Sequence, residues 1–155
     1  MSKQFILDIE SKRYLLKIAR ESIKAKLSNN YFKTSSSIPE ALNFKSGCFV
    51  TLHLNGNLRG CIGNFRQDIN IVENVSEMAI SAAFSDPRFY PITSKEFENL
   101  KIEISILSPM VRCCPEDIVV GRDGICIKKG YYSGVLLPQV ATEYGFDRET
   151  FLDQT

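Results

Sequence analysis

A thiol and a guanidinium lie two residues apart in the hexapeptide LRGCIG, residues 58–63. The hexapeptide has the composition of a β-strand, and residues i and i+2 of a strand share one face. We therefore expect the side chains of Arg59 and Cys61 to point the same way. A neighbouring cation favours the thiolate, which is the nucleophilic form of cysteine. Gly60 and Gly63 would leave the backbone open to close approach by a ligand or another chain.

Other polar residues could contribute to the same site. Glu103 lies on the polar side of an alternating strand and could act as a general base. His53 is the single histidine of the chain, and its imidazole could take part in catalysis. Arg59, Arg88 and Gln139 could contact an anionic ligand. Each of these residues also has a structural interpretation, as an exposed or ion-paired charge or as a helix cap.

The cysteines do not follow a pattern typical of disulfide frameworks or structural metal sites. Their number is odd, no C-x-x-C pair occurs, and only one histidine accompanies them. We therefore predict no metal site. Cys61 itself has two interpretations, a reactive thiol or a small buried residue in a tight hairpin. The cysteines are Cys48, Cys61, Cys113, Cys114 and Cys126.

Size and charge limit the classes to which the chain can belong. Its 155 residues, 44% of them hydrophobic, suit one domain with a sizeable core. The net charge of +1 supplies no overall field for nucleic acid, so nucleic-acid binding has little support. The chain contains no run of about eighteen apolar residues, so no membrane-spanning helix is predicted. Residues 1–8 break their short apolar run with an acid and do not resemble a signal peptide, so we expect a cytoplasmic protein.

Helical and strand patterns are interspersed along the chain. This mixture favours an α+β fold with a mixed, mainly antiparallel sheet flanked by helices. Ile102, Ile104 and Ile106 should share a core with the apolar stripe of the helix at 69–84. Residues 28–47, which include three consecutive serines, are expected to form a polar loop. The predicted helices are 8–27, 69–84 and 138–144, with a further helix capped by Asp147, and the predicted strands are 48–54, 58–65, 101–108, 125–128 and 130–137.

The register of the first hairpin can be argued from its two possible loops. A two-residue loop at 55–56 would pair Val50 with Cys61 and mix apolar and polar residues on one face. A three-residue loop at 55–57 leaves one uniformly apolar face, and buried faces specify register strongly. We therefore predict the three-residue loop. The resulting pairs are Thr51–Cys61, Leu52–Gly60, His53–Arg59 and Leu54–Leu58.

Several segments, in order along the chain, carry a resemblance to a known family. They are FVTL at 49–52, LRGCIG at 58–63, DPRF at 86–89, IEIS and LSP within 102–109, GVLLPQVA at 134–141 and TEYGFDRETFL at 142–152. Together they resemble the AMMECR domain family, whose bacterial and archaeal members are called protein A of the AmmeMemoRadiSam system. Phe146 stands where the family often has Trp, and Tyr90 where it often has Pro. Family members usually continue further, so residues 1–155 are expected to be one AMMECR-like domain truncated at its C-terminus.

The resemblance implies an α+β fold with a larger and a smaller subdomain. It supplies no reaction, substrate or cofactor, but it points to the LRGCIG hexapeptide as the functional element. The family name also implies association with a Memo-type protein and a radical SAM enzyme. Two hypotheses follow. The chain is an enzyme or substrate-handling subunit with Cys61 as reactive thiol and Arg59 as anion contact, or it is a non-catalytic module that docks a Memo-like or radical SAM partner.

Overall fold

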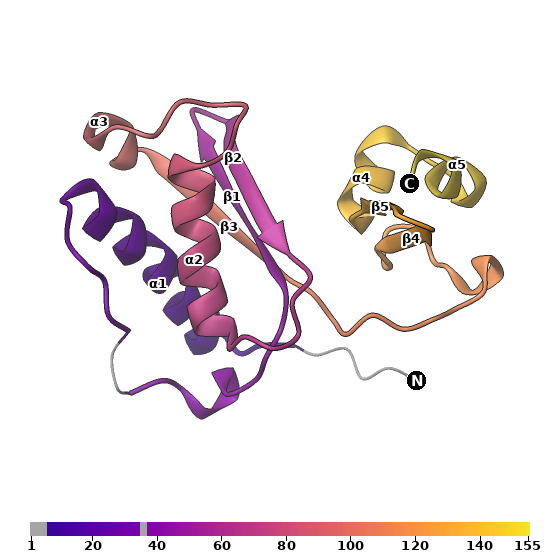
Figure 1. Cartoon of the computed structure of the whole chain (residues 1–155), viewed down its shortest axis with the longest axis horizontal. Coiled ribbons are helices and arrows are strands. Elements are labelled where there is room, and N and C mark those ends of the chain that lie inside the picture. Colours follow the sequence, from indigo (N-terminus) through magenta and orange to yellow (C-terminus); the bar gives the residue numbers. More distant parts are fainter. Residues whose placement is uncertain (1–5, 35–36) are drawn as a thin grey trace. The chain divides into compact units, whose positions relative to one another are not determined.

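The chain forms two compact units, which divide in sequence between Pro109 and Met110 (Figure 1). The computed structural model describes residues 6–34 and 37–155. Within them lie helices and two antiparallel sheets, so the expected α+β fold with a larger and a smaller subdomain is confirmed. The signal-peptide assessment rests mainly on residues 1–5, which lie outside the described residues, as do two serines of the predicted loop.

The N-terminal unit is a three-stranded antiparallel sheet with two helices packed on one face (Figure 1). β1 is the central strand, with β2 on one side and β3 on the other. Helix α2 packs on β1 and β2, while α1 contacts α2 and β3. The elements of this unit are α1 (Ile9–Leu27), a 3-10 turn (Glu40–Leu42), β1 (Cys48–Leu54), β2 (Asn57–Asn64), α2 (Ile71–Phe84), α3 (Ser94–Phe97) and β3 (Leu100–Ile106).

Polar side chains define where the helices of this unit begin. The Asp8 side chain accepts a hydrogen bond of 2.7 Å from the Ser11 amide and so caps α1. Asn70 caps α2 in the same manner, which is why this helix begins at Ile71, two residues after the predicted start at 69. Thr93 and Glu96 form a capping box at the start of α3. That box fixes the position of the Glu96 side chain.

Alternate residues of the strands build the core against the two helices. Cys48, Val50 and Leu52 of β1 are completely buried. The three isoleucines of β3 pack against the same cluster, which confirms the predicted shared core. Burial raises the pKa of the Cys48 thiol to about 12, so this cysteine is an inert core residue. The residues that α2 contributes include the predicted Val75, Met78, Ala79 and Ala82.

The C-terminal unit is a two-stranded hairpin with two short helices. Its small core consists of Ile118, Ile125, Ala141 and Phe151. Gly145 ends the first helix in the left-handed conformation, as its sequence position predicts. Among the described residues, no helix has both the length and the apolar character needed to cross a bilayer. The elements are a 3-10 turn (Pro115–Asp117), β4 (Ile125–Lys129), β5 (Tyr132–Leu136), α4 (Pro138–Tyr144) and α5 (Arg148–Gln154).

Candidate functional site

The hairpin of β1 and β2 contains a β-bulge at Arg59. Its tip is a two-residue turn, Asn55-Gly56, in which both residues have positive φ, as a type I′ turn requires. Beyond the tip the register shifts by one residue, because β2 has one residue more than β1 between the pairs His53–Leu58 and Leu52–Gly60. Arg59 is that additional residue. A bulge interrupts the alternation of side chains and changes the direction of the bulged residue.

The bulge makes one half of the predicted register right and the other half wrong. Beyond the bulge, Thr51 lies opposite Cys61, as predicted. Nearer the tip, His53 lies opposite Leu58 and not opposite Arg59, so that prediction is wrong. The tip keeps the two-residue turn that Asn-Gly favours, and the bulge then restores the register that gives β1 one apolar face. Of the remaining pairs, Leu52–Gly60 is as predicted, whereas Leu54 pairs with Asn57 instead of Leu58.

One face of the sheet is turned away from α1 and α2, and we call it the outer face. Cys61, Thr51 and Glu103 form a row across it, because Thr51 pairs with both neighbours. Cys61 is partly exposed, and its Sγ lies 3.2 Å from the Thr51 Oγ1. The His53 Nε2 lies 3.9 Å from the Glu103 Oε2. The outer face consists of Phe49, Thr51, His53, Leu58, Cys61, Gly63, Lys101, Glu103 and Ser105.

Asp86 and Arg88 hold the main chain of Cys61 from the free side of β2, and we call this pair the clamp. The Cys61 amide donates to the Asp86 Oδ2 at 2.9 Å, and the Arg88 Nη2 donates to the Cys61 carbonyl at 3.3 Å. Arg88 also donates twice to the Asp86 carboxylate, at 3.0 and 2.7 Å. Both main-chain groups of Cys61 therefore point away from β1. Cross-strand pairs of this kind bring their side chains closest together, which explains the Thr51–Cys61 contact.

The clamp also sets the electrostatics around Cys61. The Asp86 side chain is buried, and the hydrogen bond from Arg88 holds the pKa of its carboxyl well below the usual range. The Arg88 side chain is 55% exposed. Its pKa is raised, first by the hydrogen bond to Asp86 and to a lesser degree by attraction to a Cys61 thiolate. The Arg88 guanidinium therefore lies beside Cys61, where it donates a hydrogen bond to the carbonyl of that residue.

Arg59 has a different set of partners. Its Nε and Nη2 donate to the Glu96 carboxylate at 2.8 and 3.3 Å, and its guanidinium carbon lies 5.9 Å from the centre of the Phe89 ring. The pKa of Glu96 is lowered to about 2, chiefly by the hydrogen bond from Arg59. Arg59 thereby joins β2 to α3. The expectation that Arg59 and Cys61 point the same way rested on strict alternation, which does not hold at the bulge.

The two glycines of the hexapeptide are explained by packing. A Cβ on Gly60 would collide with the carbonyl oxygen of Ala82, so the missing side chain lets α2 approach β2. A Cβ on Gly63 would collide with the ring of Phe49 and with the Cys48 carbonyl. These contacts account for both residues without a ligand. Their suggested role in ligand approach stays a prediction.

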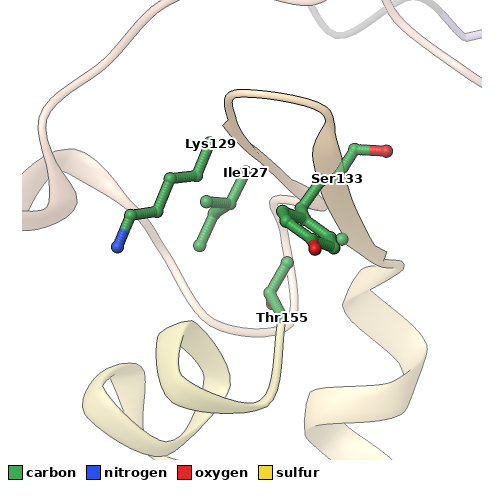
Figure 2. Close-up of a pocket in the computed structure, with 6 residues that line it drawn as sticks. Ile127, Lys129, Ser133 and Thr155 are labelled. Carbon is green, nitrogen blue, oxygen red and sulfur yellow. The ribbon is translucent and has the colours of Figure 1, made fainter.

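Gln139 lies in the C-terminal unit, where Pro138 and Gln139 begin α4. A cavity of about 250 Å³ in this unit is lined by residues of the β4–β5 hairpin and by Thr155 (Figure 2). Gln139 is not among the residues that line it. A ligand contact by Gln139 therefore stays a prediction.

Three residues of the site were not among the predicted site residues, although the predicted register already placed Thr51 opposite Cys61. Thr51, Asp86 and Glu96 each contact the hexapeptide, through the thiol, the main chain and the guanidinium respectively. The available signal for Asp86 was the pair of opposite charges on either side of Pro87. In the sequence, Glu96 can be recognised only as the third residue of a short helix, in the position that completes a capping box with Thr93. In the part of the chain that the structure describes, no group of three His, Cys, Asp or Glu side chains is arranged to hold a metal ion.

Known proteins are similar to this chain in sequence and in fold. The AMMECR1 family model matches residues 16–155. Protein MJ0810 of Methanocaldococcus jannaschii is 40% identical over 156 residues, which cover 95% of this chain and 77% of that protein. Protein PH0010 of Pyrococcus horikoshii is 40% identical over 159 residues, 92% of this chain and 75% of that protein. The crystal structure of PH0010, described as uncharacterized, superposes with a TM-score of 0.86 over 97% of this chain and 80% of its own.

Proposed function

The chain belongs to the AMMECR1 family, and from this premise we propose that it is an enzyme, or the substrate-handling subunit of one, whose reactive group is the Cys61 thiol. One observation carries the proposal. Cys61 is a partly exposed cysteine on the outer face, with a hydroxyl at its Sγ and a carboxylate–guanidinium pair bound to its main chain. Cysteines with a purely structural role are usually buried and inert, as Cys48 is.

In this proposal Arg88 and Thr51 stabilise the thiolate of Cys61. The exposed guanidinium of Arg88 attracts the negative charge, and the Thr51 hydroxyl can donate a hydrogen bond to it. Glu103 and His53 lie on the same face and are the candidates for proton transfer. The thiolate would attack an electrophilic carbon that carries a leaving group: the new C–S bond forms as the bond to the leaving group breaks, and the leaving group departs with the electron pair and takes a proton from Glu103 or His53.

The class of substrate is inferred from the part of the Arg88 guanidinium that is left for a ligand. Among the described residues its Nη1 has no hydrogen-bond partner, and more than half of the side chain is exposed. A guanidinium in this state can bind a carboxylate or phosphate. Arg59 supports the site through Phe89, because the ring of Phe89 lies against both guanidinium groups. We therefore propose an anionic electrophile as the substrate class.

Alkylation of the native protein with iodoacetate and with iodoacetamide tests the proposal. The two reagents differ mainly in charge, and the exposed Cys113 and Cys114 serve as reference thiols in the same sample. We expect Cys61 to favour iodoacetate over iodoacetamide more strongly than the references do. Arg88→Gln should reduce this preference about fivefold, which corresponds to about 1 kcal/mol of lost attraction. Peptide mass spectrometry measures the rate at each cysteine.

Arg66→Gln is the matched control for this experiment. Arg66 also pairs with a carboxylate two residues away, Asp68, but the pair does not contact Cys61. Arg88→Lys, which keeps the charge, should retain part of the preference for iodoacetate. A Cys61 that resists alkylation in the native protein contradicts the proposal. So does an Arg88→Gln variant that behaves like Arg66→Gln.

A second candidate function is a non-catalytic module that docks a Memo-like or radical SAM partner. The observation that favours it is the exposure of the hairpin tip, where Leu58 is 42% exposed. Isolated exposed apolar residues are common on protein surfaces, so this support is weaker than the support for the thiol. An unreactive Cys61, together with loss of a partner complex in Leu58→Asp, would favour docking over catalysis.

A further inference from the structure

A cavity of about 570 Å³ lies between α1 and α2 in the N-terminal unit. It includes no residue of the outer face or the clamp. Its walls come from the C-terminal half of α1, the segment that follows α1, and the middle of α2. The lining residues that carry the argument are Ser22, Lys26, Phe32, Ser76, Glu77 and Ile80.

Two hydroxyl groups join the helices where they line this cavity. The Ser22 Oγ and the Ser76 Oγ lie 2.7 Å apart. The Ser22 hydroxyl also donates to the Ile18 carbonyl at 2.7 Å, so Ser76 is the donor in the bond between the two serines. The Ser76 Oγ keeps lone pairs that can accept a hydrogen bond from a bound molecule.

Opposite charges line this cavity without pairing with each other. Lys26 comes from α1 and Glu77 from α2, and among the described residues neither forms an ion pair within 4.0 Å. The attraction between Glu77 and Arg66 acts over a longer distance, since Arg66 itself pairs with Asp68 at 2.9 Å. The cavity thus offers one ammonium group and one carboxylate.

Apolar surface lies in the same cavity. Phe32 is partly buried and packs against the main core, and Ile80 is partly buried on α2. Ile80 follows Ser76 by four residues, so both lie on one face of the helix. A ligand that uses the two charges would therefore also contact an aromatic ring and an aliphatic side chain.

We propose that this cavity binds a small zwitterion with an apolar side chain, either a free amino acid or a dipeptide. The ligand carboxylate bonds to Lys26, its ammonium to Glu77 and the Ser76 hydroxyl, and its side chain packs on Phe32 and Ile80. An anion alone would bring its charge beside Glu77, and a cation alone would bring its charge beside Lys26. The volume lies in the range of about 300–1,000 Å³ that is usual for small-molecule sites.

Titrations followed by backbone amide resonances test the proposal with two probes, leucine and leucyl-leucine. We expect saturable shifts confined to residues 22–32 and 76–80 with at least one probe, and the comparison of their affinities identifies the source. Leucine methyl ester lacks the carboxylate, and N-acetyl-leucine lacks the ammonium. Each should bind about tenfold more weakly than leucine or not at all, which is the usual loss for one charged contact.

Variants of exposed residues separate this site from a general effect on the helices. Lys26→Gln and Glu77→Gln should each weaken binding about tenfold. Lys24→Gln and Glu73→Gln change the same residue types on the same helices outside the cavity lining and should leave affinity unchanged. Absence of shifts with both probes up to about 10 mM, beyond the weakest affinity of interest, overturns the proposal. Equal loss in the cavity variants and the controls also overturns it.

Discussion

The two faces of the three-stranded sheet are built from the same strands but have opposite properties. On the inner face Cys48, Val50 and Leu52 of β1 are completely buried against the helices. On the outer face the residues between them are partly exposed, and Thr51 contacts the Cys61 thiol. The residues that stabilise the fold and those proposed for the chemistry are thus separated by a single step along a strand. Substitutions of neighbouring residues should therefore have very different effects.

The largest difference is expected between Leu52→Ala and His53→Ala. Leu52 is fully buried, and its truncation leaves a cavity in the core, which costs about 3–5 kcal/mol. His53 lies on the outer face with a third of its side chain exposed, so its truncation should change stability by about 0.5 kcal/mol or less. Urea unfolding of both variants measures the difference. Similar losses in the two variants would show that the outer face is also a core face.

Gly60→Ala tests whether the close packing of the inner face against α2 includes β2. The new methyl group would meet the backbone of Ala82, so strand and helix must separate, at a cost of about 1–3 kcal/mol. Gly56→Ala is the control, because its Cβ would meet no atom within 4 Å and only its positive φ resists the change, at about 1 kcal/mol. Thermal unfolding at one pH compares the two. A smaller loss for Gly60→Ala than for Gly56→Ala would contradict the close contact.

The smallest expected effect concerns the pH dependence of the Arg59–Glu96 pair. The pKa of Glu96 in the folded protein is about 2, below its ordinary value of 4.5. The pair therefore stabilises the fold fully above about pH 4.5, and this contribution is lost as pH falls towards 2. When the pH falls from about 4.5 to 2, the free energy of unfolding should decrease by about 1 kcal/mol less in Glu96→Gln than in the natural chain. This figure allows for the partial exposure of the pair. Parallel stability curves for the two proteins would argue against the pair.

The fold of the N-terminal unit could be predicted to a large extent because its signals are local. The apolar stripes of α1 and α2 and the alternation in β3 follow directly from helix and strand periodicity. The hairpin was harder, because the Asn-Gly turn and the apolar alternation favour different registers. Each signal alone permits one loop length. The structure satisfies both signals with an additional residue in β2, Arg59. No periodic pattern predicts such a residue.

The candidate site was less accessible to sequence reasoning, since its contacts join distant positions. Arg59 and Glu96 are separated by 37 residues, and Cys61 and Asp86 by 25. Nothing in the periodicity of either segment links them. The expected neighbour of the thiol was therefore the arginine nearest in sequence. The arginine that the fold brings to Cys61 is Arg88, which depends on how the turn after α2 folds back onto β2.

The clamp has a consequence for the behaviour of the protein in concentrated solution. β2 is an edge strand, and a free edge can pair with a strand of another molecule and start aggregation. At Cys61 both main-chain groups on the free side are already occupied by Asp86 and Arg88. The bulge at Arg59 further disturbs the regular ladder that an incoming strand would need. The contacts that position Cys61 thus also guard this edge of the sheet against self-association.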